Sequence, residues 1–362
     1  MNPNSRICRQ PVVAIVGHID HGKTTLLDQI RKSSVAAKET GGITQRVSAY
    51  EILHAGAEGD RAITFIDTPG HEAFQKMRER AGAAADIAIL IVAADDGVKP
   101  QTIEAHKAIL AANIPYIVAF TKVDKDTANL ERAKDSVAKE GIYLEGLGGD
   151  VPYAAVSGKT GEGVNELLDL IVLVADLHNI SCDAGAAMEG VVLESTRDAR
   201  IGISATIIVK QGRLTIGDFA VSGQAYAPIR MLEDFSGTKS KEITCGKPGR
   251  LSGFTGEPQV GALVTVVKTK KEAEELIKKN KQPEAPEARR AEESDDNVRI
   301  RLVLKADTIG SLEALEYEIQ KVKEERVELL MVAKNVGPIN ENDVKLLIGF
   351  SPAIILGFNV KT

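Results

Sequence analysis

The stretch GHIDHGKT, residues 17–24, carries the spacing G-x-x-x-x-G-K-[ST]. An apolar run, PVVAI, precedes it and an amphipathic run, TTLLDQIRK, follows it, as strand and helix should. Backbone N–H groups and a helix N-terminus attract phosphates, Lys23 adds a full positive charge, and the Thr24 hydroxyl can ligate Mg²⁺. The stretch predicts a nucleotide site. The residues that we expect to bind the nucleotide here are Gly17, His18, Ile19, Asp20, His21, Gly22, Lys23, Thr24 and Thr25.

A carboxylate suited to the same metal ion lies in ITFIDTPGHEAF, residues 63–74. Asp67 ends an apolar strand there, where it can hold the Mg²⁺ shell, often through water. Gly70 follows, and without a Cβ its backbone N–H can approach a γ-phosphate. Alone, this stretch could be a simple turn, but downstream of a phosphate loop it favours a nucleotide site.

Two further stretches predict recognition of the base. The apolar strand YIVAF ends in TKVD, which places Asp124 at the C-terminal edge of the sheet. An aspartate accepts two N–H bonds from guanine that adenine cannot offer, so it selects GTP over ATP. The stretch SGKTGEG, at 157–163, follows the next strand. The expected base-side residues are Thr121, Lys122, Asp124, Ser157, Gly158 and Lys159.

The segment KETGGITQR, residues 38–46, lies between the phosphate loop and Asp67 and has no strong secondary-structure pattern. Its Thr44 hydroxyl could close on Mg²⁺ only when a γ-phosphate is present, which would make the segment a switch. A plain glycine turn is the alternative.

The elements that must position these residues alternate along residues 11–182. Short apolar runs at the strand positions are separated by helical patterns such as QTIEAHKAILAAN and VNELLDLIVLVADL. This alternation predicts an α/β domain with a doubly wound, mostly parallel sheet. Ligands bind such sheets at the C-terminal ends of the strands.

The rest of the chain predicts two more domains. Residues 183–268 carry short strand patterns broken by glycine turns, which indicates a small antiparallel β-barrel. Residues 269–297 have the composition of a charged linker that begins as a helix. This linker is either a solvated spacer or a segment whose basic end contacts RNA. Residues 298–362 alternate strand and helix patterns, which predicts an α/β unit that we expect to be truncated. We expect residues 1–10 to be an N-terminal tail.

Composition narrows the class of protein. The net charge of −6 argues against a protein coated for bulk nucleic-acid binding. The longest apolar run, IAILIVAA, is too short to cross a bilayer, and the chain begins without an apolar signal core, so we expect a cytoplasmic protein that binds no membrane. Cys8, Cys182 and Cys245 have no metal-ligand spacing, and we expect three reduced thiols rather than a disulfide.

Taken together, GHIDHGKT, GGIT, DTPGHEAF, ADDGVKPQT and TKVD resemble the motifs of translational GTPases, and specifically the bacterial initiation factor two family. The barrel stretch ATIIVKQGRLTIGD and the later VLKADTIGSLEAL and ILGFNV resemble that family's second and third domains. The resemblance implies GTP and GDP as ligands, Mg²⁺ as cofactor, and a monomer that acts on both ribosomal subunits and hydrolyses GTP when the ribosome stimulates it. It implies contact with initiator tRNA only in the full-length protein.

The resemblance also assigns roles in hydrolysis. His71 matches the family's water-positioning histidine, beside Gly70, and Ile19 and Ile43 match the apolar gate that holds this histidine back. Asp20, a carboxylate beside phosphates, needs a compensating cation. In the family the matching aspartate is thought to hold K⁺ or Na⁺, which implies the same for Asp20 with Gly42. For His18 and His21 we expect a structural role.

Two residues depart from the family's pattern. Thr121 stands where the motif usually has Asn, which removes an amide that helps to fix the base and the loop. Gly158 replaces the usual Ala, which we expect to be milder because the backbone makes the contact. The alternative functions are an elongation-type or selenocysteine-type translational GTPase, or a binding module with little turnover. The VLKAD stretch followed by a long helix argues against the first alternative, and ribosome-stimulated phosphate release tests the second.

Overall fold

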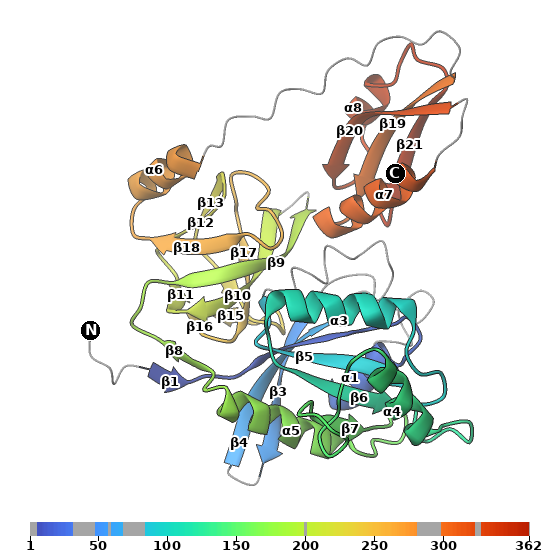
Figure 1. Ribbon diagram of the computed structural model, residues 1–362. Coiled ribbons are helices and arrows are strands. Elements are labelled where there is room, and N and C mark those ends of the chain that lie inside the picture. Colours follow the sequence, from blue (N-terminus) through green and yellow to red (C-terminus); the bar gives the residue numbers. More distant parts are fainter. Residues whose placement is uncertain are drawn as a thin grey trace.

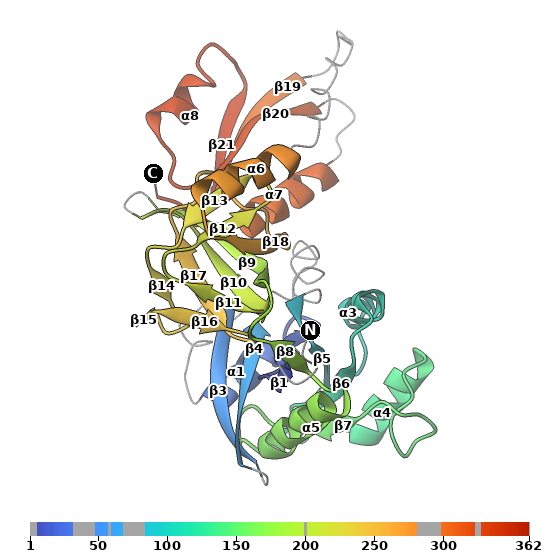
Figure 2. The same ribbon diagram turned by 90° about the vertical axis from the view of Figure 1, so that its left-hand side faces the viewer.

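The computed structural model describes residues 6–31, 48–56, 59–67, 84–198, 201–280, 298–322 and 327–361. They form a first α/β domain, a β-barrel and a third, smaller α/β domain, in that order along the chain (Figure 1). The predicted fold class is confirmed. Figure 2 shows the third domain at the end of the barrel that lies away from α4 (Leu130–Lys139) and α5 (Val164–Leu177) of the first domain.

The first domain is built on a six-stranded sheet in the order β3-β4-β2-β5-β6-β7. All neighbouring strands are parallel except β3 and β4. The central strands are apolar along their whole length because helices cover both faces of the sheet. The strands are β2 (Val12–Gly17), β3 (Ser48–Gly56), β4 (Gly59–Asp67), β5 (Ile87–Ala93), β6 (Tyr116–Thr121) and β7 (Tyr153–Ala155).

Two apolar clusters lie on opposite faces of this sheet. One joins the strands to α1 (Lys23–Arg31) and α5, with Leu26 and Ile171 fully buried. The other joins them to α3 (Pro100–Ala112) and α4, with Ile109 and Val137 buried. The sheet is therefore doubly wound, as the alternation of strand and helix patterns predicts.

The barrel is antiparallel throughout, and its apolar side chains form a separate core. Its main sheet has the order β13-β12-β18-β9-β10-β17-β14-β15, and β11 pairs with β16 beside it. The strands are β9 (Glu189–Asp198), β10 (Gly202–Gln211), β11 (Arg213–Thr215), β12 (Phe219–Ser222), β13 (Ala225–Pro228), β14 (Leu232–Glu233), β15 (Lys239–Ser240), β16 (Glu242–Thr244), β17 (Pro248–Ser252) and β18 (Leu263–Val267).

An ion network joins the first domain to the barrel. Asp86 receives two hydrogen bonds from the Arg9 guanidinium, at 2.6 and 2.7 Å, and one from Lys210 of the barrel at 2.7 Å. Burial favours a higher pKa for Asp86, but the hydrogen bonds from Arg9 and the charge of Lys210 outweigh it and hold the pKa below its usual range. Lys210 also donates to the carbonyl of Ala84, so the barrel contacts the segment that leads into β5.

Two expectations for the N-terminal part and the cysteines are wrong. Part of the expected tail is strand β1 (Arg6–Cys8), which pairs with β8 (Ser181–Asp183) at the exit from the first domain. Cys182 of β8 and Cys245 form a disulfide, whereas Cys8 is free. Because the two cysteines are 63 residues apart and meet only when β8 lies against the barrel, no local spacing could indicate the pair.

The expected linker begins with helix α6 (Lys270–Asn280), as its charge pattern predicts; residues 281–297 lie outside the described ranges. In the third domain, β19 lies between β20 and β21 and is parallel to both. Thr308, which caps α7, forms an isolated bridge with Thr196 of the barrel. The elements are β19 (Val298–Ala306), α7 (Ile309–Lys321), β20 (Val327–Val336), α8 (Glu341–Lys345) and β21 (Ala353–Phe358).

Candidate nucleotide-binding site

The phosphate loop leaves β2 at Gly17 and enters α1 at Lys23. Gly17 has φ +148°, and a Cβ there would lie 2.7 Å from the carbonyl oxygen of Ile91, so only glycine allows the loop to pass β5 this closely. Gly22 has φ +85°, and its carbonyl accepts the first helical bond, from the N–H of Leu26 at 2.9 Å. The N–H groups of the first turn of α1 are thus directed at the loop, as phosphate binding requires.

Charged groups of both signs accompany the loop. The Lys23 ammonium donates to the carbonyls of Gly17, at 3.0 Å, and His18, at 2.6 Å, so it lies inside the loop. Asp67 is the last residue of β4, which pairs with β2, and it is 4% exposed. Thr24 follows Lys23 at the start of α1. These residues fit a Mg²⁺ ion beside bound phosphates, with Thr24 and Asp67 on neighbouring elements.

His21 holds the loop against the sheet. Its side chain is 1% exposed, its Nδ1 accepts a hydrogen bond from the Ala93 N–H at 3.3 Å, and its ring meets that of His18 edge-on, 4.9 Å between centroids. Burial, with a smaller effect of His18, lowers the pKa of His21 to about 4, so the ring is neutral near pH 7. His21 is thus held in place by the end of β5, and His18 lies against it.

The base-side residues lie at the ends of β6 and β7. The Ser157 hydroxyl donates to the Asp124 carboxylate at 2.7 Å and accepts from the N–H groups of Lys159 and Thr160. This hydrogen bond is the main reason that the pKa of Asp124 falls below its usual range. Asp124 and Lys159 are exposed and Ser157 is buried. An ionised, oriented carboxylate that faces solvent can accept two N–H bonds from guanine.

Thr121 and Gly158 connect this base side to the phosphate loop. The Thr121 hydroxyl donates to the carbonyl of His21 at 2.5 Å. A Cβ on Gly158 would lie 2.8 Å from the backbone nitrogen of Leu26, so the loop after β7 packs directly on α1. The structure thus brings the phosphate and base motifs to one edge of the sheet.

Comparisons with known proteins relate the three domains to translation factors. Family models match residues 9–176 as the elongation factor Tu GTP binding domain, 187–267 as elongation factor G domain 2 and 272–362 as translation-initiation factor 2. Translation initiation factor IF-2 of Kosmotoga olearia is 43% identical over 98% of this chain and 52% of its own length. That of Fervidobacterium nodosum is 41% identical over 99% of this chain and 54% of its own length.

The chain belongs to the translation initiation factor 2 family. It spans about half the length of these curated relatives. The structure of GDP-bound aIF5B from Aeropyrum pernix is similar with a TM-score of 0.60 and 25% identity, over 98% of this chain and 69% of that one. A bacterial selenocysteine-specific elongation factor, EF-Sec, shares the fold with a TM-score of 0.58 over 71% of this chain and 45% of that one, at 23% identity.

Sequence reasoning missed three residues that contact the candidate site. Gln101, in the first turn of α3, accepts a hydrogen bond from the backbone N–H of Ile19 at 3.0 Å. Asp96 lies 3.6 Å from Nε2 of His21. Asp95 pairs with Lys125 at 2.7 Å and lies 3.8 Å from Lys122. All three belong to ADDGVKPQT, which follows the C-terminal end of β5. Because β5 lies beside the strand that leads into the phosphate loop, the position of this stretch could have identified them.

Some predicted site residues lie outside the described part of the chain. These are Gly42, Ile43, Thr44, Gly70 and His71. Asp20 is described: it is exposed and has φ +60°, a left-handed conformation uncommon for residues other than glycine.

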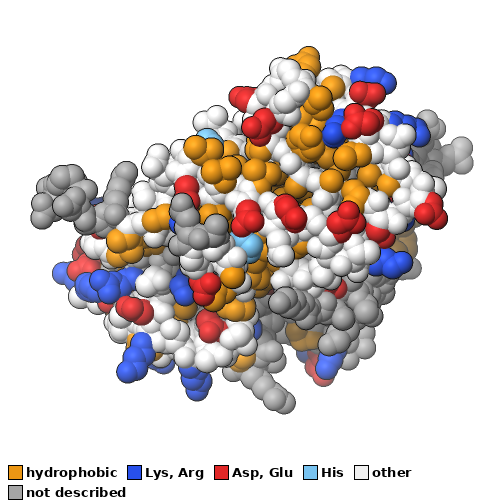
Figure 3. Space-filling view, turned by 90° about the horizontal axis from the view of Figure 1, so that it is seen from below, with side chains coloured by type: hydrophobic (Ala, Val, Ile, Leu, Met, Phe, Trp, Pro, Cys, Tyr) orange, Lys and Arg blue, Asp and Glu red, His pale blue; other side chains and the backbone are white. Residues whose placement is uncertain are grey.

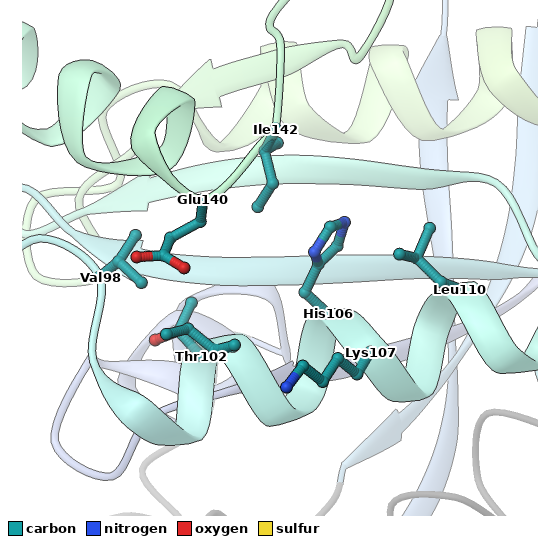
Figure 4. A pocket seen from close by; sticks show the side chains of 8 residues that line it. Val98, Thr102, His106, Lys107, Leu110, Glu140 and Ile142 are labelled. Atoms are coloured by element: carbon teal, nitrogen blue, oxygen red, sulfur yellow. The ribbon is translucent and has the colours of Figure 1, made fainter.

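A pocket of about 300 Å³ lies on the α3 side of the first domain and contains none of the predicted nucleotide residues. Figure 4 shows His106 projecting from α3 toward Ile142, with Glu140 and Leu110 on either side. The ring of His106 has a partner, the Tyr116 hydroxyl at 3.1 Å, and burial lowers its pKa. The pocket lies between α3 and the end of α4, and apolar and polar side chains contribute equally to its lining.

Charge on the surface agrees with the acidic composition. The face seen from below the first domain has hydrophobic and acidic side chains at its centre, with Lys and Arg toward the edges (Figure 3). None of the described helices is long and apolar enough to span a membrane.

Proposed function

We propose that this chain is the GTP-dependent switch of a translation initiation factor: it binds GTP, hydrolyses it to GDP and phosphate, and acts on the ribosome. One observation carries the proposal. The phosphate loop, Asp67, Asp124 and Ser157 lie at one edge of a doubly wound sheet, in a chain whose three parts match the family's domain order.

We assign the binding steps to these residues and to Thr44. Backbone N–H groups of residues 17–25 receive the phosphates and Lys23 neutralises their charge, while Asp124, held by Ser157, accepts the guanine N–H groups. Thr24, Thr44 and Asp67 would hold Mg²⁺, which neutralises the phosphate charge that develops during hydrolysis. We also assign Lys122 and Lys159 to the base side, because they lie two residues from Asp124 and from Ser157 in the sequence.

Hydrolysis requires a water held in line with the γ-phosphate. We assign this role to His71, with Gly70 beside it and Ile19 and Ile43 as the gate. Ile19 is held in place because its N–H donates to Gln101. Turnover should be slow until the ribosome moves His71 past the gate.

A monovalent cation would resolve the charge problem at Asp20. Its exposed carboxylate lies in a loop that receives phosphates, and a K⁺ or Na⁺ ion between Asp20, Gly42 and a phosphate would remove the repulsion. GTP affinity and hydrolysis are then expected to depend on K⁺ or Na⁺ in the wild type but not in Asp20→Ala. Equal behaviour of the two proteins across K⁺, Na⁺ and a bulky organic cation contradicts this assignment.

The partners follow from the family. We expect a cytoplasmic monomer that contacts the ribosomal subunits and their RNA, and we expect the longer relatives to place initiator tRNA through segments beyond those matched here. An elongation-type or selenocysteine-type role is disfavoured because residues 272–362 match translation-initiation factor 2.

Nucleotide binding tests the proposal directly. GTP, GDP, ATP and XTP are titrated against the chain by calorimetry, and GTP and GDP should bind far more tightly than the other two. Preference for ATP overturns the function. Ribosome-stimulated phosphate release then separates an enzyme from a binding module: the wild type should respond, and His71→Ala should not. Equal rates remove the assignment of His71.

A further inference from the structure

Thr121 stands where the family usually has Asn. Its contacts are not those of a residue that binds the base. The side chain is 2% exposed at the end of β6, and its backbone carbonyl accepts a hydrogen bond from the Ala94 N–H at 2.9 Å. Its hydroxyl donates to the His21 carbonyl at 2.5 Å. Both contacts lead toward the phosphate loop and the end of β5.

A hydroxyl has one hydrogen to donate, whereas the amide of Asn has two. The hydrogen of Thr121 is already used by His21, so none is left for the acceptor atoms N7 and O6 of a guanine. Recognition of the base then depends on Asp124, whose carboxylate accepts a hydrogen bond from Ser157.

The contact with His21 has a clear structural purpose. The side chain of His21 is fixed on Ala93 at the end of β5, and its carbonyl is fixed by Thr121 at the end of β6. A Cβ on the neighbouring Gly22 would make an ordinary van der Waals contact with the Thr121 hydroxyl oxygen, at 3.8 Å. Two strands thereby hold the turn that precedes Lys23.

We infer that Thr121 is a positioning residue of the phosphate loop and makes no contact with guanine N7, so that this chain binds guanine nucleotides without an N7 contact from position 121. The inference rests on the proposed function. Thr121 thus keeps one of the two roles of the family's usual Asn, the hydrogen bond to the phosphate loop, and loses the other, the contact with the base.

The experiment compares GDP with 7-deaza-GDP, which lacks the N7 acceptor, on the wild type and three variants. The wild type should bind both nucleotides within about twofold of each other. Thr121→Val, which cannot donate, should weaken both by about tenfold and leave their ratio unchanged. Thr121→Ser should restore both affinities. Thr121→Asn should bind GDP about three- to tenfold more tightly than 7-deaza-GDP.

Each outcome decides the inference. A wild type that prefers GDP over 7-deaza-GDP by tenfold, with the preference lost in Thr121→Val and kept in Thr121→Ser, shows that the Thr121 hydroxyl contacts the base. A Thr121→Val protein with unchanged affinities shows that the hydrogen bond to the phosphate loop has no effect on binding. Should Thr121→Val fail to fold, the wild-type ratio and the Thr121→Ser and Thr121→Asn proteins still decide it. Failure of the wild type to bind any guanine nucleotide instead refutes the proposed function.

Discussion

The phosphate side and the base side of the site are built in different ways. The phosphate side is a backbone loop enclosed by buried partners: Gly17 passes against Ile91, and His21 is held by the ends of β5 and β6. On the base side, the carboxylate of Asp124 is exposed and is held by the hydroxyl of one buried residue, Ser157. Changes on the phosphate side should therefore alter stability and the binding of every nucleotide, whereas changes on the base side should alter which nucleotide binds.

The largest expected effect is a change of base preference in Asp124→Asn. An amide in place of the carboxylate cannot accept both guanine N–H groups, but it can donate to the O2 of xanthine. Affinity for GDP should fall about a thousandfold or more, with a gain for XDP. Competition titrations with the two nucleotides measure this ratio.

Asp126→Asn is the matched control, since Asp126 is an exposed carboxylate two residues further along the same loop. It should keep the GDP preference of the wild type. An unchanged ratio of GDP to XDP affinity in Asp124→Asn would show that the base is read elsewhere, and the division between the two sides would not hold.

The same division explains what the sequence could predict. The elements β2, β5, β6, α1 and α5 follow their local patterns closely because apolar runs and helical periodicity reflect burial on one or both faces. The phosphate loop has a fixed spacing because its function depends on local backbone geometry. The described motifs therefore lie at the C-terminal ends of the parallel strands, the edge at which the sequence predicts them.

The rest depends on residues far apart in the sequence. Gln101 contacts Ile19 across 82 positions and Ala93 contacts His21 across 72, and no local pattern encodes such pairs. Strand β3 was missed because an antiparallel edge strand with mixed burial has no continuous apolar run. The cysteine pair was missed for the same reason of distance.

The second-largest expected effect is a dependence of stability on pH, which tests the phosphate side. His21 is buried and neutral, with its pKa lowered to about 4, while an unfolded histidine titrates near 6.5. Between these values the unfolded state binds more protons than the native state, so stability falls as pH falls. From pH 7 to pH 5 the wild type should lose about 2 kcal/mol of unfolding free energy through this group.

Urea denaturation at pH 7, 6 and 5 measures the loss, with His21→Gln as the variant and the exposed His178→Gln as the control. The pH dependence of His21→Gln should be smaller than that of the wild type by the stated amount, and that of His178→Gln should not. Parallel curves for the wild type and His21→Gln would mean that this side of the site is not held by a neutral, buried ring.

The smallest effect concerns Gly158, where the two sides meet. A Cβ there would lie 2.8 Å from the nitrogen and 2.9 Å from the Cα of Leu26, and 2.9 Å from the carbonyl carbon of Thr25. These are backbone atoms of α1, so either the base-side loop or the helix must shift. The sequence led us to expect only that Gly158 is a milder departure than Thr121, whereas the packing predicts a cost of about 1 kcal/mol in unfolding free energy for Gly158→Ala.

Nucleotide binding shows which of the two moves. A displaced loop carries Ser157 away from Asp124, so GDP affinity should fall about three- to tenfold, while tripolyphosphate, which has no base, should bind as it does to the wild type. Gly256→Ala is the control, because its nearest neighbour would be an ordinary contact at 3.7 Å. A parallel loss of tripolyphosphate binding would show that α1 moves instead, and that the base side is fixed more firmly than its exposed side chains indicate.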